Sequence, residues 1–169
     1  MQDNQGVTLI ELIIVMAIIG ILAAGSLFGA NILGYGSARS TVVRINTMLD
    51  AVQIENMTKS KTYYLVIYRD GRDYYIQVEA GTQVVTKEKL KLVRGEIAYE
   101  TQEGDNYLVS DVPVSGRNIS PKLELCFKKD TGGVSPNRNN EKISRIDVSS
   151  AGSDYTIKLV GLTGKHYIE

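Results

Sequence analysis

Hydrophobic residues follow two different patterns along the first 60 positions of the chain. Residues 12–33 contain no charged side chain, so 22 consecutive positions are compatible with a membrane interior. At a rise of about 1.5 Å per residue, a helix of that length crosses a hydrocarbon core of roughly 30 Å. From residue 38 to about residue 59 the pattern becomes amphipathic, and the apolar positions that share one helical face are Val42, Ile45, Met48, Leu49 and Val52. We therefore expect one long helix, roughly residues 8–60, whose second half lays an apolar stripe on a sheet.

Glycines interrupt this helical pattern at two places. Gly34 and Gly36 stand at the junction of the two halves, and each costs about 1 kcal/mol relative to alanine in a helix. We expect a weak point there. Gly25 and Gly29 lie four residues apart inside the apolar run, which either allows close approach of another helix or reflects the general frequency of glycine in membrane helices.

The pattern after residue 62 is that of β-strands. Residues 63–68 and 74–78 flank Asp70 and Gly71, and a turn signal between two β-prone runs predicts a hairpin. The first of these strands is apolar on both faces, so we expect it to run centrally beneath the helix. Further strands are expected at residues 83–86, 90–93, 96–100, 123–127, 146–148 and 155–159, the last within a closing hairpin over 154–168. Residues 101–121 and 130–141 are expected to be irregular loops, the second of them exposed.

The fold class that follows is α+β: a long N-terminal helix, transmembrane in its first half and amphipathic in its second, packed on an antiparallel β-sheet domain. Lysine plus arginine and aspartate plus glutamate balance at 19 each, which gives no overall electrostatic preference for nucleic acid. From residue 117 onward there are nine basic against six acidic residues, so DNA stays open as a partner.

The composition argues against several kinds of site. A single histidine, His166, and a single cysteine, Cys126, exclude the usual zinc clusters and any intrachain disulfide. We expect Cys126 to be a small, half-buried side chain. Residues 161–165 lack the spacer and the final Ser/Thr of a phosphate loop, and Asp147 and Asp154 belong to no contiguous calcium loop, so we expect a tight turn and solvated acids. We therefore expect no catalytic residue, no metal, no cofactor and no enzymatic activity.

The junction that opens the apolar run is chemically unusual. Glu11 is a lone carboxylate at its start, and a charged acid at the centre of a bilayer costs about 2.5–3.5 kcal/mol. Either it has a partner there or it lies at the headgroup boundary and extends toward water. The sequence Gly6-Val-Thr-Leu-Ile-Glu11, followed by the apolar run, resembles the prepilin signal of type IV pilins. A secretory signal peptide is excluded, because there is no basic leading segment and the apolar run is too long.

This resemblance implies a set of processing and assembly steps. A membrane peptidase cuts after Gly6 and N-methylates the new first residue, Val7. Glu11 pairs with the N-terminal amine of a neighbouring subunit, and in a low dielectric such a pair reduces the desolvation cost of both charges. Residues 1–6 contain no Lys or Arg, and Val7 stands where Phe is commoner in the family. The expected orientation in the membrane is therefore inferred from the motif and not from the distribution of basic residues.

The resemblance also implies a domain organisation and a function. Residues 1–6 are the prepilin leader, residues 7–36 the transmembrane and assembly half of the helix, and residues 37–169 the globular domain, with helix 37–60 and strands within 62–169. The protein would be a single-pass cytoplasmic (inner) membrane protein with its C-terminal domain outside the cytoplasm, and then part of a filament at the cell surface. Its partners would be the prepilin peptidase, the membrane, and other pilin or pseudopilin subunits bound through the N-terminal helix.

Three related functions are open on this basis. The first is a structural subunit of a type IV pilus or pilus-like filament. The second is a pseudopilin of a type II secretion system, because the hairpin over 154–168 and the start of the amphipathic helix are similar to the minor pseudopilins of the H-type. The third is a minor pilin that binds DNA or surfaces at a filament tip. The absence of a disulfide favours a minor subunit, a pseudopilin or a pilin of a Gram-positive cell.

Overall fold

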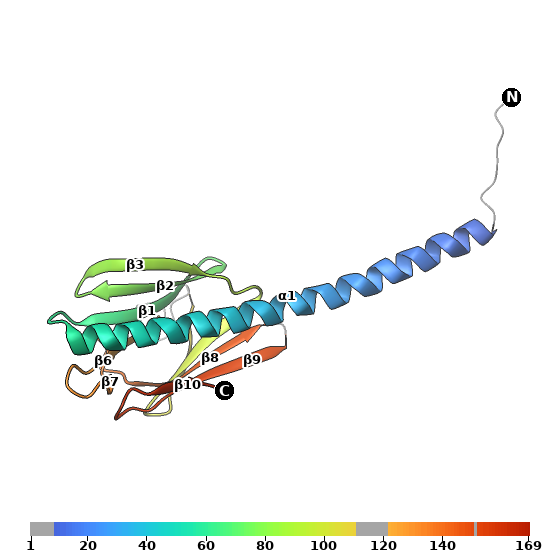
Figure 1. The fold of residues 1–169 in the computed structure, drawn as a ribbon. Helices are drawn as coiled ribbons and strands as arrows, with labels where there is room; N and C mark the ends of the chain where they lie inside the picture. Colours follow the sequence, from blue (N-terminus) through green and yellow to red (C-terminus); the bar gives the residue numbers. More distant parts are fainter. Residues whose placement is uncertain (1–8, 111–121, 151) are drawn as a thin grey trace.

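The computed structural model describes residues 9–110, 122–150 and 152–169, and the side chains of these residues except 24–35. In this part of the chain one helix, α1 (Leu9–Thr58), accompanies ten strands in two antiparallel sheets. The C-terminal half of α1 lies along the sheets, and its N-terminal half extends away from them (Figure 1). The α+β class and the long helix agree with the sequence pattern.

The helix runs through Gly34 and Gly36 without interruption. The expectation of a weak point at these glycines is therefore wrong, because the backbone stays helical through them. A penalty of about 1 kcal/mol per glycine does not break a helix that is held over many turns. The expectation for Gly25 and Gly29 concerns packing in a segment whose side chains lie outside the described residues.

Sheet A has the order β3-β2-β1-β6-β7, and β1 runs centrally in it as predicted. The β1–β2 hairpin is also confirmed: Asp70 pairs with Asp73, and Gly71 at the turn has φ +61°, a conformation that favours glycine. The strands are β1 (Tyr63–Asp70), β2 (Asp73–Ala80), β3 (Gln83–Leu90), β6 (Leu123–Phe127) and β7 (Val134–Ser135).

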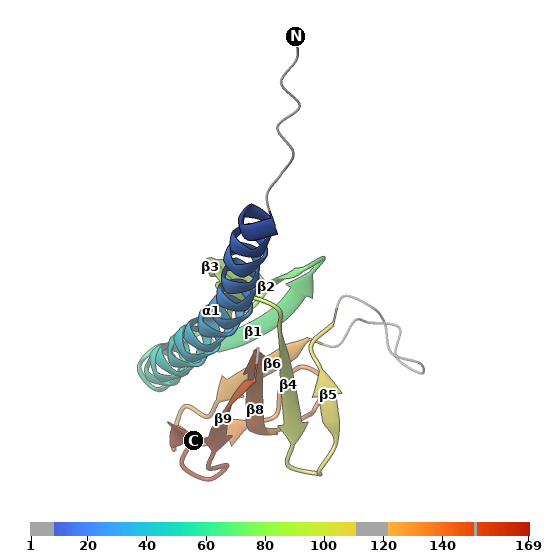
Figure 2. The ribbon, with the colours of Figure 1, turned by 90° about the vertical axis from the view of Figure 1, so that its right-hand side faces the viewer.

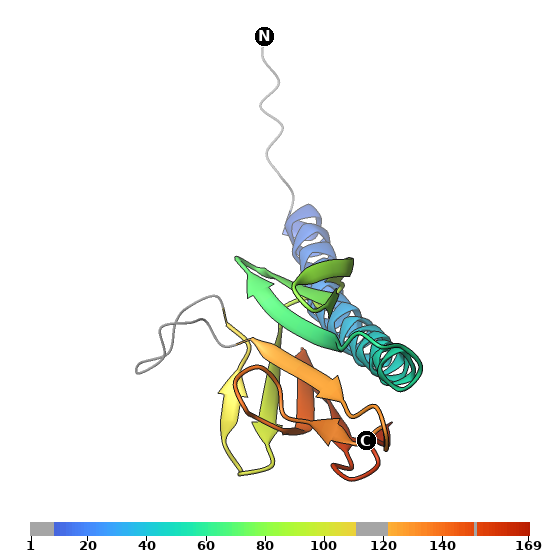
Figure 3. The same cartoon turned by 90° about the vertical axis from the view of Figure 1, so that its left-hand side faces the viewer.

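Sheet B has the order β10-β9-β8-β4-β5. The expected closing hairpin is confirmed as β9 and β10, which pair from His166 opposite Leu159 to Ile168 opposite Ile157. The strands are β4 (Gly95–Thr101), β5 (Asn106–Leu108), β8 (Ile143–Ser150), β9 (Ser153–Leu159) and β10 (His166–Ile168). Sheet A curves past one side of α1 and sheet B lies below it, as the two end-on views show (Figures 2 and 3).

The amphipathic half of α1 packs against both sheets. It contacts β1 and β6 of sheet A and β8, β9 and β10 of sheet B. The predicted stripe is confirmed, because Ile45 and Leu49 are fully buried and the other stripe residues are at most 7% exposed. Each such side chain contributes about 1.5–3 kcal/mol through burial. One helix face thus joins two sheets, where the sequence pattern predicted a single sheet.

Several local expectations are corrected by tertiary contacts. β3 continues to Leu90, and residues 91–94 after it are not a strand. β5 occupies part of the segment that was expected to be irregular, the remainder of which, residues 111–121, lies outside the described residues. The loop over 130–141 contains β7, and Val134 and Asn137 within it are buried.

The alternation expected in β6 is absent, because all five of its residues are buried. Glu124 is 1% exposed and pairs with Arg138 of the β7–β8 loop, and Cys126 is 2% exposed. The thiol of Cys126 donates to the Pro136 carbonyl at 3.3 Å. Cys126 is therefore buried and not half-buried, since the loop that was expected to be exposed folds back over the outer face of β6.

Candidate assembly site

The first turns of α1, residues 9–22, present apolar side chains to their surroundings on all sides. Between residues 9 and 21 the large apolar side chains are 50–77% exposed, and they occupy consecutive positions of the helix. A Cβ placed on Gly20 would meet nothing within 4 Å. Soluble monomers rarely expose apolar patches of this extent, so the segment is a surface for a partner or an apolar medium.

The described residues contain no helix that is long and apolar enough to cross a membrane. The charge-free run predicted over 12–33 includes residues 24–33, whose side chains lie outside the described residues.

Glu11 lies in the first turn of α1 as the structure describes it, and its side chain is exposed. The backbone N–H groups at a helix N-terminus carry a partial positive charge, which favours a carboxylate at this position. The structure therefore places an acidic group at the end of α1 that is remote from the globular domain (Figure 1). Gly6 and Val7, the predicted processing residues, lie outside the described residues.

Polar contacts add to the apolar stripe in holding the C-terminal half of α1 in place. Arg44 donates through both Nε and Nη2 to Oε2 of Glu88 on β3, at 3.0 and 2.5 Å. Gln53 Nε2 donates to the carbonyls of Gly132 and Thr163, at 2.8 and 3.1 Å. These contacts connect α1 to one edge strand and to two loops, so the orientation of the helix on the domain is defined along its whole docked length.

His166 connects α1 to the last strand. Its Nε2 lies 3.0 Å from Oδ1 of Asp50 on α1, and its Nδ1 lies 2.9 Å from the Gly164 carbonyl. The imidazole is 2% exposed, and its ring centroid lies 6.2 Å from that of Phe127. The one histidine of the chain is thus part of the packing between α1 and the C-terminal hairpin.

A partly buried charge network, which sequence reasoning missed, lies on the outer face of sheet A. Arg138 pairs with Glu79 at 2.6 Å and with Glu124 at 3.2 Å, and its guanidinium lies 4.1 Å from the ring centroid of Tyr64. Burial acts to lower the pKa of Arg138, but the hydrogen bond to Glu79 and the charge of Glu124 raise it overall. The partners are 59 and 14 residues away in sequence, so no local motif could have indicated the network. Its role is to neutralise a carboxylate that the fold buries.

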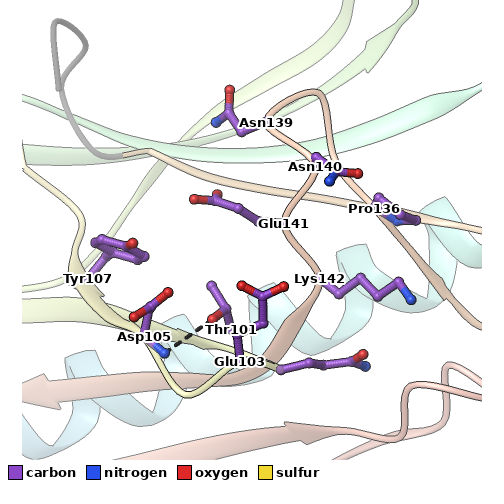
Figure 4. A pocket seen from close by; sticks show the side chains of 10 residues that line it. Thr101, Glu103, Asp105, Tyr107, Pro136, Asn139, Asn140, Glu141 and Lys142 are labelled. Carbon is purple, nitrogen blue, oxygen red and sulfur yellow. Dashed lines mark hydrogen bonds between the residues drawn. The ribbon is translucent and has the colours of Figure 1, made fainter.

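A pocket of about 520 Å³ lies between the β4–β5 turn and the β7–β8 loop. Glu103, Asp105 and Glu141 line it together with Tyr107, and Lys142 also belongs to the lining, although its side chain extends away from the three carboxylates (Figure 4). Its lining is therefore polar and mainly acidic.

The other residues considered for chemistry serve structural purposes. The carboxylate of Asp147 accepts hydrogen bonds from Thr156 Oγ1 at 2.6 Å and from Arg145 Nε at 2.9 Å. Residues 160–165 form a tight turn in which the Val160 N–H donates to the Lys165 carbonyl at 2.8 Å. Across the described residues, no group of three or more His, Cys, Asp and Glu side chains is placed to hold a metal ion.

Comparison with known proteins connects the N-terminal segment to one family. Residues 1–27 match the family model of the prokaryotic N-terminal methylation motif. The match contains Gly6, Val7 and Glu11, the three residues singled out from the junction. No curated protein and no solved structure matches the chain.

Proposed function

We propose that this chain, a pilin-like protein whose residues 1–27 contain the type IV prepilin signal, is a structural subunit of a type IV pilus or pilus-like filament. The observation that carries the proposal is the division of α1 into two halves. Residues 9–22 of α1, which lie within the matched segment, expose apolar side chains all round, whereas the C-terminal half of the helix is embedded in a two-sheet domain. This arrangement suits a subunit whose apolar helix packs among other helices while the domain faces outward.

In this proposal the prepilin peptidase removes residues 1–6 and N-methylates Val7. Before assembly, residues 7–36 hold the subunit in the cytoplasmic membrane, with residues 37–169 outside the cytoplasm. The charge-free run over 12–33 supports storage in the membrane, because 22 apolar-compatible positions match a hydrocarbon core of roughly 30 Å.

Glu11 then provides the counter-charge for the methylated amine of Val7 in a neighbouring subunit. Both charges would otherwise be desolvated singly when the apolar helices come together, at a cost of several kcal/mol each. A position at the exposed start of α1, remote from the folded domain, leaves Glu11 accessible to a second chain.

Processing is tested by intact-mass measurement on protein from membranes and from sheared filaments. We expect a chain that begins at Val7 and is heavier by one CH₂, roughly 14 mass units, than the cleaved unmodified chain. Gly6→Leu should block cleavage, whereas Gly20→Leu, a matched change at a glycine with open space around it, should leave cleavage intact. Retention of Met1, or cleavage near the small residues Ala23, Ala24 and Gly25, where a secretory signal peptide would be cut, would contradict the proposal.

The type of filament is tested separately, by the genes that neighbour this one and by the fraction in which the processed protein accumulates. A pilus operon and recovery from sheared surface filaments support a pilus subunit. A secretion operon, with the processed protein confined to the cell envelope, supports a pseudopilin.

A further inference from the structure

The free edge of sheet A is long and exposed. β3 is the end strand of the sheet, and among the described residues β2 is its one partner strand. Residues 83–87 are all exposed, and among them Val84 and Val85 are 53% and 58% exposed. An edge strand with exposed β-branched residues presents unpaired backbone groups together with apolar surface, which is a template for pairing with another chain.

Positive charge lies in the connection from β3 to β4. Lys91 and Arg94 are exposed, and neither forms an ion pair with another described residue. The ammonium of Lys87, in contrast, lies over the rings of Tyr68 on β1 and Tyr75 on β2, at 5.5 and 5.0 Å from their centroids, so it is directed across the face of sheet A. We call Val84, Val85, Lys91 and Arg94 the β3 edge surface.

Within the described part of the chain, the edge of sheet B that β5 forms has the opposite charge. β5 is its end strand, and Leu108 on it is 41% exposed. Glu103 and Asp105, in the turn before β5, are exposed, and neither forms an ion pair within the described part of the chain. We call Glu103, Asp105 and Leu108 the β5 edge surface. It lies at the side of the domain away from α1, whereas β3 lies beside α1 (Figures 2 and 3).

We propose that the β3 edge surface of one copy of this chain docks on the β5 edge surface of a second copy, so that sheet A of one subunit meets sheet B of the next. The proposal rests on the filament function and adds a contact between globular domains. Because the two surfaces differ, every copy can use both, and the contact propagates along an open assembly instead of closing into a dimer. Apolar residues meet at its centre, and basic residues face acidic ones around them.

The remaining edges fit this role less well. β7 has two residues, and the Val134 N–H already donates to the Gly161 carbonyl at 2.9 Å. β10 lies against α1. Pairing of β3 with a second β3 would bring two basic surfaces together, which is unfavourable. The short β5 gives a weak contact on its own, but subunits already held together through α1 have a high effective concentration.

Disulfide trapping in the full-length chain tests the contact. A chain that carries both Val85→Cys and Leu108→Cys, produced in its own cells and mildly oxidised, should give a ladder of reducible dimers, trimers and longer oligomers. Either substitution alone should give none. A control chain with Leu162→Cys and Leu108→Cys should also give none, although Leu162 is 86% exposed and therefore more available for random collision.

Charge reversal is the second test of the contact. Lys91→Glu with Arg94→Glu should reduce the ladder several-fold, as should Glu103→Lys with Asp105→Lys, and all four changes in one chain should restore it. Absence of the ladder, dimers from Val85→Cys alone, or equal trapping of the control pair would each overturn the contact. Whether the chain without introduced cysteines is recovered in filaments is measured separately. If that chain forms filaments but the cysteine pair gives no ladder, this contact is overturned and the proposed function still stands.

Discussion

The side-chain amide of Asn56 forms two hydrogen bonds with the backbone of Tyr63. Asn56 Nδ2 donates to the Tyr63 carbonyl at 2.8 Å, and Asn56 Oδ1 accepts from the Tyr63 N–H at 2.8 Å. Asn56 is fully buried, near the end of α1, and Tyr63 is the first residue of β1. One side chain thus occupies the position that a neighbouring strand would take, and it defines how the chain passes from the helix into the central sheet.

A fragment that spans residues 37–169 should fold alone. Among the side chains that the structure describes, those of the buried apolar cluster all lie at or after Ala38, so the fragment retains this core and omits the exposed apolar residues 9–22. We expect a soluble monomer with one cooperative unfolding transition in urea, measured by circular dichroism. Aggregation or a gradual, non-cooperative transition would show that the helix does not dock stably on the two sheets.

Asn56→Leu should destabilise this fragment strongly. The substitution leaves the N–H and the carbonyl of Tyr63 without their partners at a partly buried position, and a group left unpaired in a fully buried site costs about 1–3 kcal/mol. Urea unfolding gives the change in the free energy of unfolding. Asn139→Leu is the matched control, because Asn139 is exposed and should tolerate the change within about 0.5 kcal/mol. Equal effects at the two positions would contradict the role given to Asn56.

Leu49→Asp should prevent or severely weaken folding of the fragment. Leu49 is fully buried between α1 and the sheets, and an unpaired carboxylate there costs several kcal/mol. Ile54→Asp is the control on the same helix, since Ile54 is 61% exposed and should lose little stability. The comparison uses the same urea titration, and a similar loss at both positions would exclude the docked orientation of α1.

Alkaline pH should destabilise the domain partly through Cys126. Burial raises the pKa of the Cys126 thiol above its ordinary value of 9.0. The neutral thiol therefore contributes its stability below about pH 9, and this is lost as the pH rises toward the folded-state pKa, because the unfolded chain ionises first. Cys126→Ala should show a shallower decline in unfolding free energy above pH 9 than the wild-type fragment. Identical slopes would contradict a buried, neutral thiol.

Glu11→Leu should separate processing from assembly. The change removes the only charge between residues 7 and 33, so membrane insertion becomes easier, and cleavage at Gly6 should largely continue. The amine of Val7 would enter the helix bundle without a counter-charge, so the processed protein should accumulate in the membrane and be absent from sheared filaments. Glu11→Asp should be intermediate, because the charge remains and its reach is one methylene shorter.

The control for this experiment is Glu55→Leu, a change at an acid of α1 that pairs with Lys59 on the globular domain. It should assemble at the wild-type level. Wild-type recovery of Glu11→Leu in filaments would show instead that Glu11 is an interfacial residue that extends toward water.

The sequence by itself determined the features that depend on short-range periodicity. These are the long helix, the stripe that includes Ile45 and Leu49, the central β1, the hairpin at Gly71 and the terminal hairpin. It also indicated the junction at Gly6, Val7 and Glu11, which lies within the matched motif. Each of these signals is contained within a few turns of helix or a pair of neighbouring strands, where side-chain spacing is enough.

Only the tertiary structure decided which elements meet. It divided the strands into two sheets under one helix, buried Glu124 by means of Arg138, covered Cys126 with a loop, and placed His166 beside Asp50. It also placed the basic β3 edge and the acidic β5 edge at different sides of the domain. These relationships join residues that are far apart in the chain, so they depend on strand order and register, which local hydrophobic patterns do not specify.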